Sequence, residues 1–249
     1  PIIVALENSE SVKNKIANDF IGHAVLCVGR AEISDTFIDN NPSKEVDTVK
    51  GARIKIKDWD TIRKEFVFID DNYPVYQKEY LDSPTSRYNE INWNECKISH
   101  FIVPLYKRIY LEAYIAKKLV EEILKSNYFS FADGRELYIR TFLCSTRSYR
   151  KYVMLSDMDL NLKNIINSKN MPKFIWVTEI TDVYRIKNKK ASGLILLDAT
   201  EANEYSNKAL IFALCNGLLI QYDNESKNMS SYQCVMKDFT MFNSNLKKL

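Results

Sequence analysis

The sequence predicts an α+β protein with two successive regions. Short apolar stretches bounded by glycine, proline, aspartate and asparagine recur in the first hundred residues and are typical of strands. Near residue 100 the character changes, because a segment with apolar residues at helical spacing follows. Two further strong strands come later in the chain. We therefore divide the chain into residues 1–99 and residues 100–249, each expected to contain a sheet.

The first region contains four predicted strands. Residues 1–6, 24–28 and 65–69 are almost continuously apolar, and residues 52–57 alternate between apolar and polar side chains, as expected for a half-exposed strand. The intervening segments are predicted as follows: a short helix or loop at 12–21, a surface insertion at 31–48, a short connector at 58–64, and a long irregular loop with aromatic anchors at 73–94.

The second region begins with a strand at 98–103. Apolar residues at 109, 113, 116, 120 and 123 then predict an amphipathic helix that starts at Pro104. Strands are expected at 136–144, 173–180 and 193–199, the last two flanking a lysine-rich turn at 187–190. The remaining expectations are a helix or strand at 145–157, a short helix at 159–168, a strand or helix at 210–221, and a polar tail from 224.

Composition excludes several classes of function. The 35 basic and 32 acidic residues nearly balance and are interspersed, so nucleic-acid binding is not expected. No apolar run is long enough to cross a membrane, and the first residues do not have the pattern of a signal peptide. The five cysteines are far apart without a C-x-x-C pair. We expect no cofactor, no metal and a reducing, cytoplasmic location.

The best candidate for chemistry combines a histidine and two aspartates. His23, one of only two histidines, opens the strand at 24–28, and Asp70 and Asp71 follow directly after the strand at 65–69. If these strands are neighbours, either aspartate could reach the ring of His23. A neutral histidine can take a proton from a thiol or hydroxyl when a carboxylate fixes its tautomer.

A family resemblance rests on the same segments. The strand at 1–6, the run G-H-A-V-L-C-V-G at 22–29 and the run F-V-F-I-D-D-N-Y-P-V-Y at 66–76 resemble the C-terminal half of papain-like cysteine peptidases, including the bacteriocin-leader peptidases and their bacterial relatives. The resemblance covers roughly the first 80 residues and implies a half-domain with an antiparallel sheet. It implies that His23 is the general base and Asp71 the residue that orients it. Asp70 is the alternative, since a shift of one residue moves a side chain to the other face.

The nucleophile of that family has no counterpart in this sequence. The family's catalytic cysteine and its oxyanion-binding glutamine would both precede Pro1, and we expect the chain, which lacks an initiator methionine, to be a fragment or processed form. Cys27 is four residues from His23 on the same strand, about 13 Å away. Cys96, in a loop near His100, is the least implausible substitute, although nothing around it indicates an activated thiol.

Two functions remain open from the sequence. The chain is either the base-bearing part of a cysteine-peptidase-like hydrolase, with an upstream cysteine as nucleophile, or a catalytically inactive relative that binds a peptide or protein partner. In both, Tyr73 and Tyr76 are candidates for substrate or partner contact. His100 is expected to be structural. Glu179 and Asp198, at the ends of two strands, are a candidate second polar pair.

Overall fold

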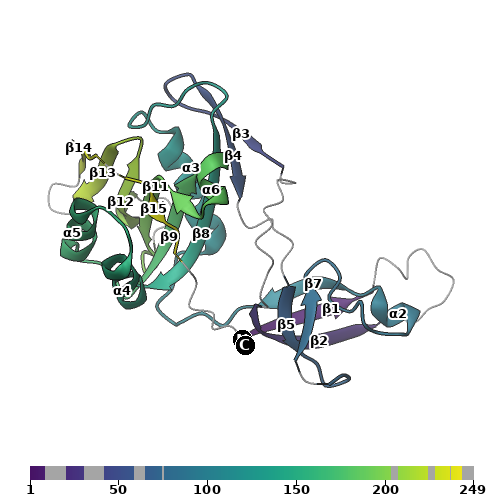
Figure 1. Ribbon diagram of the computed structural model, residues 1–249. Helices are drawn as coiled ribbons and strands as arrows, with labels where there is room; N and C mark the ends of the chain where they lie inside the picture. The colour runs from purple at the N-terminus through teal and green to yellow at the C-terminus, as the bar shows by residue number, and fades with distance from the viewer. Residues whose placement is uncertain are drawn as a thin grey trace. The chain divides into compact units, whose positions relative to one another are not determined.

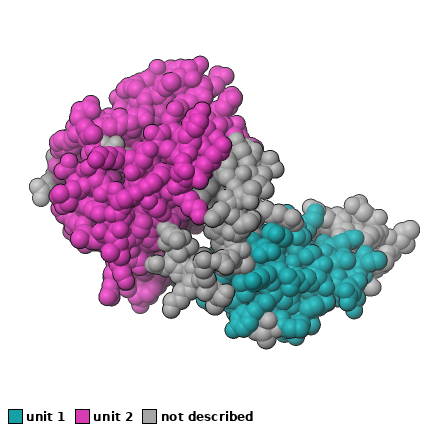
Figure 2. Space-filling model, in the orientation of Figure 1, with its two compact units in different colours: residues 1–39, 61–105, 244–249 teal, residues 40–60, 106–243 magenta. Residues whose placement is uncertain are grey.

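Helices and antiparallel strands occur together in the chain, which confirms the α+β class. The computed structural model describes residues 1–8, 21–30, 42–58, 65–74, 76–202, 207–223, 228–235 and 237–242. The chain forms two compact units (Figure 2). Unit 1 comprises residues 1–39, 61–105 and 244–249, and unit 2 comprises residues 40–60 and 106–243.

Unit 1 is built on one five-stranded sheet (Figure 1). Its strand order is β6-β5-β2-β1-β7, and every neighbouring pair is antiparallel. The elements of unit 1 are β1 (Ile2–Glu7), β2 (Gly22–Arg30), β5 (Glu65–Ile69), β6 (Gln77–Tyr80), α2 (Ile91–Asn94) and β7 (Lys97–Ile102). The predicted strands at 1–6, 24–28, 65–69 and 98–103 are confirmed. The segment at 73–94 is not irregular throughout, because β6 and α2 lie within it.

One face of this sheet carries the core of unit 1. Val4 and Leu6 of β1 and Val25 of β2 are buried together with Phe68 of β5. The alternation places every second side chain of β1 and β2 on this face. His23 therefore lies on the core side of β2, two residues before Val25.

Unit 2 contains an eight-stranded sheet with the order β14-β13-β12-β11-β9-β8-β4-β3. All neighbouring pairs are antiparallel except β4 and β8, which are parallel. The strands of unit 2 are β3 (Lys44–Asp47), β4 (Arg53–Asp58), β8 (Glu136–Ser145), β9 (Phe174–Thr181), β10 (Lys190–Ala191), β11 (Gly193–Asp198), β12 (Leu210–Cys215), β13 (Leu218–Asp223), β14 (Asn228–Gln233) and β15 (Phe239–Thr240). Strands β10 and β15 form a separate antiparallel pair.

The division at residue 99 therefore needs correction. Strands β3 and β4 come from the first hundred residues but belong to unit 2. Their buried side chains explain this, because Val46, Ile54 and Ile56 pack into the same core as Leu137 of β8. The segment at 31–48 was expected to be a surface insertion, and its described end is instead an edge strand of this sheet.

Helices cover both faces of the sheet in unit 2 (Figure 1). The helices are α3 (Ala113–Lys125), α4 (Thr146–Leu155), α5 (Leu160–Ser168) and α6 (Val183–Lys187), and a 3₁₀ turn, η2, spans Asn207–Ala209. Leu119 and Val120 of α3 pack on one face of the sheet, while Tyr149 of α4 and Leu162 of α5 pack on the other. The predicted helix at 159–168 is confirmed, and the segment at 145–157 is a helix rather than a strand.

The amphipathic helix starts later than predicted. It begins at Ala113, not at Pro104, because the preceding backbone has other hydrogen-bond partners. The amide groups of Tyr110 and Leu111 both donate to the carbonyl of Ala199, and the carbonyl of Leu111 accepts from the indole of Trp176. These bonds fix residues 110–111 to the carbonyl of Ala199, just after β11, and to Trp176 of β9.

Two connections differ from the expected ones. Residues 210–221 form two strands, β12 and β13, joined by Asn216 and Gly217, whose φ angles of 51° and 74° give a tight hairpin turn. Strands β9 and β11 pair as predicted, although α6 and β10 lie between them in place of a simple turn.

Among the described residues, no helix is both long and apolar enough to span a membrane. The expectations for 12–20 and 59–64 lie outside the described residues.

Candidate functional site

The pairing of β2 with β5 brings the candidate residues together. The two strands are antiparallel, with Leu26 opposite Ile69, so the start of β2 lies beside the end of β5. His23 precedes Leu26 by three positions, and Asp70 and Asp71 follow Ile69 directly. Strands β2 and β5 are therefore adjacent, which is the arrangement that brings His23 close to the two aspartates.

His23 contacts Asp70 more closely than Asp71. Its Nε2 atom lies 2.9 Å from Oδ1 of Asp70 and 3.4 Å from Oδ1 of Asp71. The Asp70 side chain is only 4% exposed, whereas the Asp71 side chain is 83% exposed. A buried carboxylate interacts more strongly than one screened by water. The geometry thus favours Asp70, the alternative from the sequence, over Asp71 as the orienting residue.

Asp70 is held in place by two further donors. The hydroxyl of Tyr88 donates to its Oδ2 atom over 2.5 Å, and the backbone amide of Asn72 donates to Oδ1 over 2.9 Å. Burial raises the pKa of Asp70, but the hydrogen bonds from Tyr88, Asn72 and His23 outweigh it and hold the pKa below its ordinary value. Burial and the hydrogen bond to Asp70 together raise the pKa of Tyr88. Asp70 is therefore a carboxylate at neutral pH and Tyr88 is a neutral donor.

Aromatic rings surround this pair of side chains. The Trp93 ring, on α2, meets His23 edge-on with the ring centroids 5.4 Å apart. Tyr88 stacks on Trp93 at 5.1 Å, and Tyr73 lies 4.4 Å from Tyr88. The sequence predicts packing roles for Tyr88 and Trp93, with the rim of a substrate groove as the alternative. In the sequence, only the concentration of aromatic residues at 73–94 indicates that these rings lie near His23.

This arrangement fixes the chemistry available to His23. Asp70 accepts from Nε2, so the neutral ring carries its proton on that atom and presents Nδ1 as an acceptor. Within the described part of the chain, Nδ1 makes no hydrogen bond. His23 can therefore take a proton at Nδ1 while Asp70 stabilises the resulting imidazolium.

None of the five cysteines is an activated thiol. Cys27 and Cys96 of unit 1 are buried, and burial raises the pKa of both. The Sγ atom of Cys96 lies 3.6 Å from the carbonyl of Asn92, to which it donates. In unit 2, burial raises the pKa of Cys144 to about 11 and that of Cys215 to about 12, and it raises that of Cys234 as well. A nucleophilic cysteine needs a lowered pKa and partial exposure.

The same three side chains meet the geometric requirement for a metal site. The ligand atoms of His23, Asp70 and Asp71 lie within 4.8 Å of one another. From the sequence we expected no metal here. Both Asp70 oxygens already accept hydrogen bonds, from His23 and Asn72 at Oδ1 and from Tyr88 at Oδ2. Protein donors therefore already engage both carboxylate oxygens of Asp70, whereas Asp71 is exposed.

The other candidate residues of unit 1 lie in different surroundings. The hydroxyl of Tyr73 donates to the carbonyl of Arg87, so this ring is anchored. Tyr76 is 61% exposed and has a φ of 69°, which is unfavourable for a tyrosine. It makes no ring contact or hydrogen bond with any described residue. His100 is exposed on β7 and pairs with Ala5 of β1 through the backbone.

The predicted pairing of Glu179 with Asp198 is wrong. In the antiparallel pair of β9 and β11, Glu179 lies opposite Leu194 and Asp198 lies opposite Ile175, so the two carboxylates are at different ends of the strands. Glu179 is fully buried and pairs with Arg140 of β8, whose Nη2 atom is 3.0 Å from Oε2. Asp198 accepts from Thr200.

Comparison of the chain with protein-family models, with curated proteins and with solved structures finds no match.

Proposed function

We propose that unit 1 carries the base of a cysteine-peptidase-like hydrolase, with His23 as the proton acceptor and Asp70 as the residue that orients it. The observation that carries this proposal is the buried Asp70 carboxylate, which bonds Nε2 of His23 at 2.9 Å and is itself fixed by Tyr88. The family resemblance, which rests on the same segments, is consistent with these roles.

In this proposal a thiol approaches the Nδ1 side of His23. His23 removes the thiol proton, and the thiolate attacks the carbonyl carbon of a peptide or other acyl substrate. The imidazolium then returns the proton to the leaving group as the bond between that group and the carbonyl carbon breaks, which leaves a thioester. Water, deprotonated by the neutral ring, attacks the thioester and releases the acid and the free thiol. Because the five thiols of this sequence are buried or have raised pKa values, the proposal assigns the nucleophile to a cysteine upstream of Pro1.

Thiol alkylation of the full-length natural protein tests this function. We expect one cysteine outside residues 1–249 to react with iodoacetamide at pH 6, where an ordinary thiol with a pKa of about 8.5 is almost inert. His23→Gln should slow that reaction at least tenfold, and Asp70→Asn should slow it less. Asp71→Asn is the matched control and should change little, because its carboxylate is exposed.

The hydrolase proposal fails if no cysteine outside this segment reacts at pH 6. It also fails if His23→Gln leaves the alkylation rate of the reactive cysteine unchanged. In either case His23 does not activate a thiol.

A second candidate function, peptide or protein binding without catalysis, is favoured by Tyr76. An exposed aromatic residue at positive φ is strained, and such strain is retained mainly at functional positions. Tyr73 stands near it in sequence with a fixed ring. The two tyrosines are then the contact residues, as the sequence suggested.

Replacement of Tyr76 by glycine separates binding from folding. Glycine accepts positive φ, so Tyr76→Gly should stabilise the fold by about 1 kcal/mol. Peptides selected from a random displayed library on the wild-type protein should bind this variant at least tenfold more weakly. Equal binding by wild type and Tyr76→Gly, or the absence of any selected peptide, would count against this function.

A peptide or protein is the expected substrate or partner, without nucleic acid or membrane. The free state of all five cysteines supports a reducing, cytoplasmic environment.

A further inference from the structure

Asp71 has no part in the function proposed for unit 1, yet its carboxylate lies beside the same histidine. Its Oδ1 atom is 3.4 Å from Nε2 of His23, and Oδ1 of Asp70 is 2.9 Å from that nitrogen. The neutral ring has one proton on Nε2 to share between the two carboxylates. Carboxylates this close together repel each other and attract a cation. The place around Nε2 is therefore suited to a positive ion.

The spacing of the three ligand atoms fits a small divalent ion. Zn²⁺ binds nitrogen and oxygen at about 2.0–2.2 Å in tetrahedral geometry, so two ligand atoms on one ion lie roughly 3.3–3.6 Å apart. The distance from Nε2 to Oδ1 of Asp71 falls in this range, and the distance to Oδ1 of Asp70 needs to open by only roughly 0.4 Å. In the described part of the chain, this is the one group of three such side chains whose ligand atoms converge.

The surrounding hydrogen bonds suit a ligating carboxylate. The hydroxyl of Tyr88 donates to Oδ2 of Asp70, and the amide of Asn72 donates to Oδ1. Outer donors of this kind orient the ligands in metal sites. A carboxylate oxygen has two lone pairs, so Oδ1 can keep its bond from Asn72 and bind an ion where it now accepts from His23. The exposed Asp71 leaves a path from solvent to the site.

We propose that His23, Asp70 and Asp71 bind one Zn²⁺ ion, through Nε2 and one oxygen of each carboxylate. One imidazole with two carboxylates favours a borderline transition-metal ion over Mg²⁺, which takes oxygen ligands in a near-ideal octahedron. With three protein ligands, the fourth position of the ion is left for water. The ion takes the place of the Nε2 proton, so the neutral ring then carries its proton on Nδ1.

The same ion regulates the base of unit 1, and this step rests on the function proposed above. His23 can accept a proton at Nδ1 only while its own proton is on Nε2, where Asp70 accepts it. With Zn²⁺ on Nε2, Nδ1 is already protonated and cannot take a proton from a thiol. Zn²⁺ binding and proton acceptance are therefore mutually exclusive, and the ion inhibits the hydrolase.

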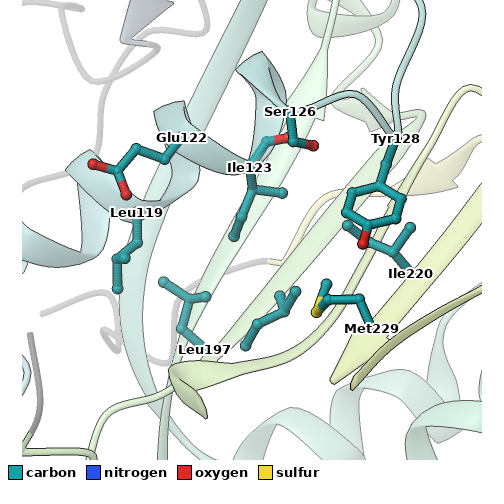
Figure 3. Close-up of a pocket in the computed structure, with 9 residues that line it drawn as sticks. Leu119, Glu122, Ile123, Ser126, Tyr128, Leu197, Ile220 and Met229 are labelled. Carbon is teal, nitrogen blue, oxygen red and sulfur yellow. The ribbon is translucent and has the colours of Figure 1, made fainter. Parts of the chain in front are cut away.

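Calorimetry with Zn²⁺ tests the metal site on the 249-residue chain at pH 7, where no nucleophile is needed. We expect one-to-one binding, at least tenfold weaker binding by Asp71→Asn, and no measurable binding of Mg²⁺ at the same concentrations. Asp71 is exposed, so this variant should fold like wild type. Glu122→Gln is the matched control and should leave the Zn²⁺ affinity unchanged. Glu122 is an exposed carboxylate of α3 that lines an apolar pocket of unit 2 (Figure 3).

The ring nitrogens of His23 locate the bound ion. On addition of Zn²⁺, ¹⁵N NMR should show that Nε2 loses its proton and that Nδ1 gains one, while the ring signals of the exposed His100 stay unchanged. Absence of Zn²⁺ binding, or equal affinity of wild type and Asp71→Asn, would overturn the site. Binding that leaves the ring signals of His23 unchanged would overturn it as well.

Thiol alkylation of the full-length natural protein tests the regulatory step. Zn²⁺ should slow the iodoacetamide reaction of the upstream cysteine at least tenfold in wild type, EDTA should restore the rate, and Asp71→Asn should be slowed much less. Because Zn²⁺ also binds thiols directly, equal inhibition of both proteins would overturn the regulatory step, although not the metal site. If no cysteine reacts in the absence of Zn²⁺, the proposed function fails and the regulatory step with it. The calorimetry still decides the metal site.

Discussion

At the scale of single residues, Asp70 is the centre of the candidate site. It is a nearly fully buried carboxylate with three hydrogen-bond donors: the ring of His23, the hydroxyl of Tyr88 and the amide of Asn72. A carboxylate in such a place is stable only because these donors replace its water. The same bonds hold the histidine ring in one orientation, so the stability of the site and its chemistry depend on the same contacts.

The contribution of Tyr88 should depend on pH. Tyr88→Phe removes a hydrogen bond to a charged group and should lower the free energy of unfolding by about 1.5–3 kcal/mol at pH 7. The folded pKa of Asp70 lies below its unfolded value of 3.8. The stabilisation is therefore fully present above the unfolded pKa and is lost as pH falls through the folded pKa. Urea unfolding from pH 7 to pH 3 should show the difference between wild type and variant shrinking below about pH 4.

Tyr73→Phe is the matched control, because this hydroxyl donates to a neutral carbonyl. Its effect should be about 1 kcal/mol and constant with pH. A constant difference for Tyr88→Phe over the same range would mean that the hydrogen bond to the Asp70 carboxylate is not its source.

At the scale of elements, the sheet of unit 2 contains a buried ion pair between neighbouring strands. Arg140 of β8 lies opposite Glu179 of β9, and the backbone amide of Phe242 donates to Oε1 of Glu179 over 2.6 Å. Arg140 also donates to the carbonyl of Phe242. Burial raises the pKa of Glu179, and Arg140 and the Phe242 amide oppose that effect. The pair therefore fixes the segment that follows β15 to two strands of the sheet.

Removal of one partner should cost more than removal of both. Glu179→Leu leaves the mostly buried Arg140 without its counter-charge and should lower the free energy of unfolding by about 3–5 kcal/mol. The double variant Arg140→Met/Glu179→Leu should be more stable than Glu179→Leu alone, because two apolar side chains fit the core. Chemical denaturation of the two variants measures the difference. A double variant less stable than Glu179→Leu would show that the unpaired charge of Arg140 is not the source of the loss.

At the scale of the whole molecule, the chain builds two cores from interleaved segments. Residues 40–60 leave unit 1 after β2, supply β3 and β4 to unit 2, and are followed by β5 in unit 1. Ile54 of β4 is fully buried in the unit 2 core. The parallel pairing of β4 with β8 joins residues about 80 positions apart in sequence.

Ile54→Ala tests which core β4 stabilises. The substitution should destabilise unit 2 by about 2–5 kcal/mol, because it leaves a cavity in a closely packed core. Amide hydrogen exchange should then speed up in β8 and β9 and remain unchanged in β1 and β2. Val25→Ala, in the core of unit 1, should give the opposite pattern. Faster exchange in β1 and β2 of the Ile54 variant would contradict the assignment of β4 to unit 2.

Local sequence patterns predicted most elements of the fold, because they report on backbone preference and burial. The strands around His23 and Asp70 are apolar runs ended by glycine or aspartate, and these are local signals. The Asn216–Gly217 hairpin has a local signal too, an Asn-Gly pair between two apolar runs. No local signal indicates that β4 belongs to unit 2, since this depends on its parallel pairing with β8, which is distant in sequence.

The choice between Asp70 and Asp71 could not be made from local patterns. A shift of one residue along a strand moves a side chain to the opposite face. The structure distinguishes the two aspartates because Tyr88 and Asn72 donate hydrogen bonds to the inward carboxylate, that of Asp70. Tyr88 is 18 residues from Asp70 in sequence. Tyr88 reaches Asp70 only when α2 and the loop that precedes it fold against β2.

The most direct test of the central claim is the tautomer of His23, measured by ¹⁵N NMR of the imidazole ring in its neutral form. The account predicts a proton on Nε2 and none on Nδ1, with a slowly exchanging Nε2 proton in wild type and Asp71→Asn. Asp70→Asn should speed the exchange of that proton or mix the tautomers, while the exposed His100 serves as the internal reference. A proton on Nδ1 in the wild-type protein, or an effect of Asp71→Asn larger than that of Asp70→Asn, would contradict the assignment of Asp70 as the residue that orients the base.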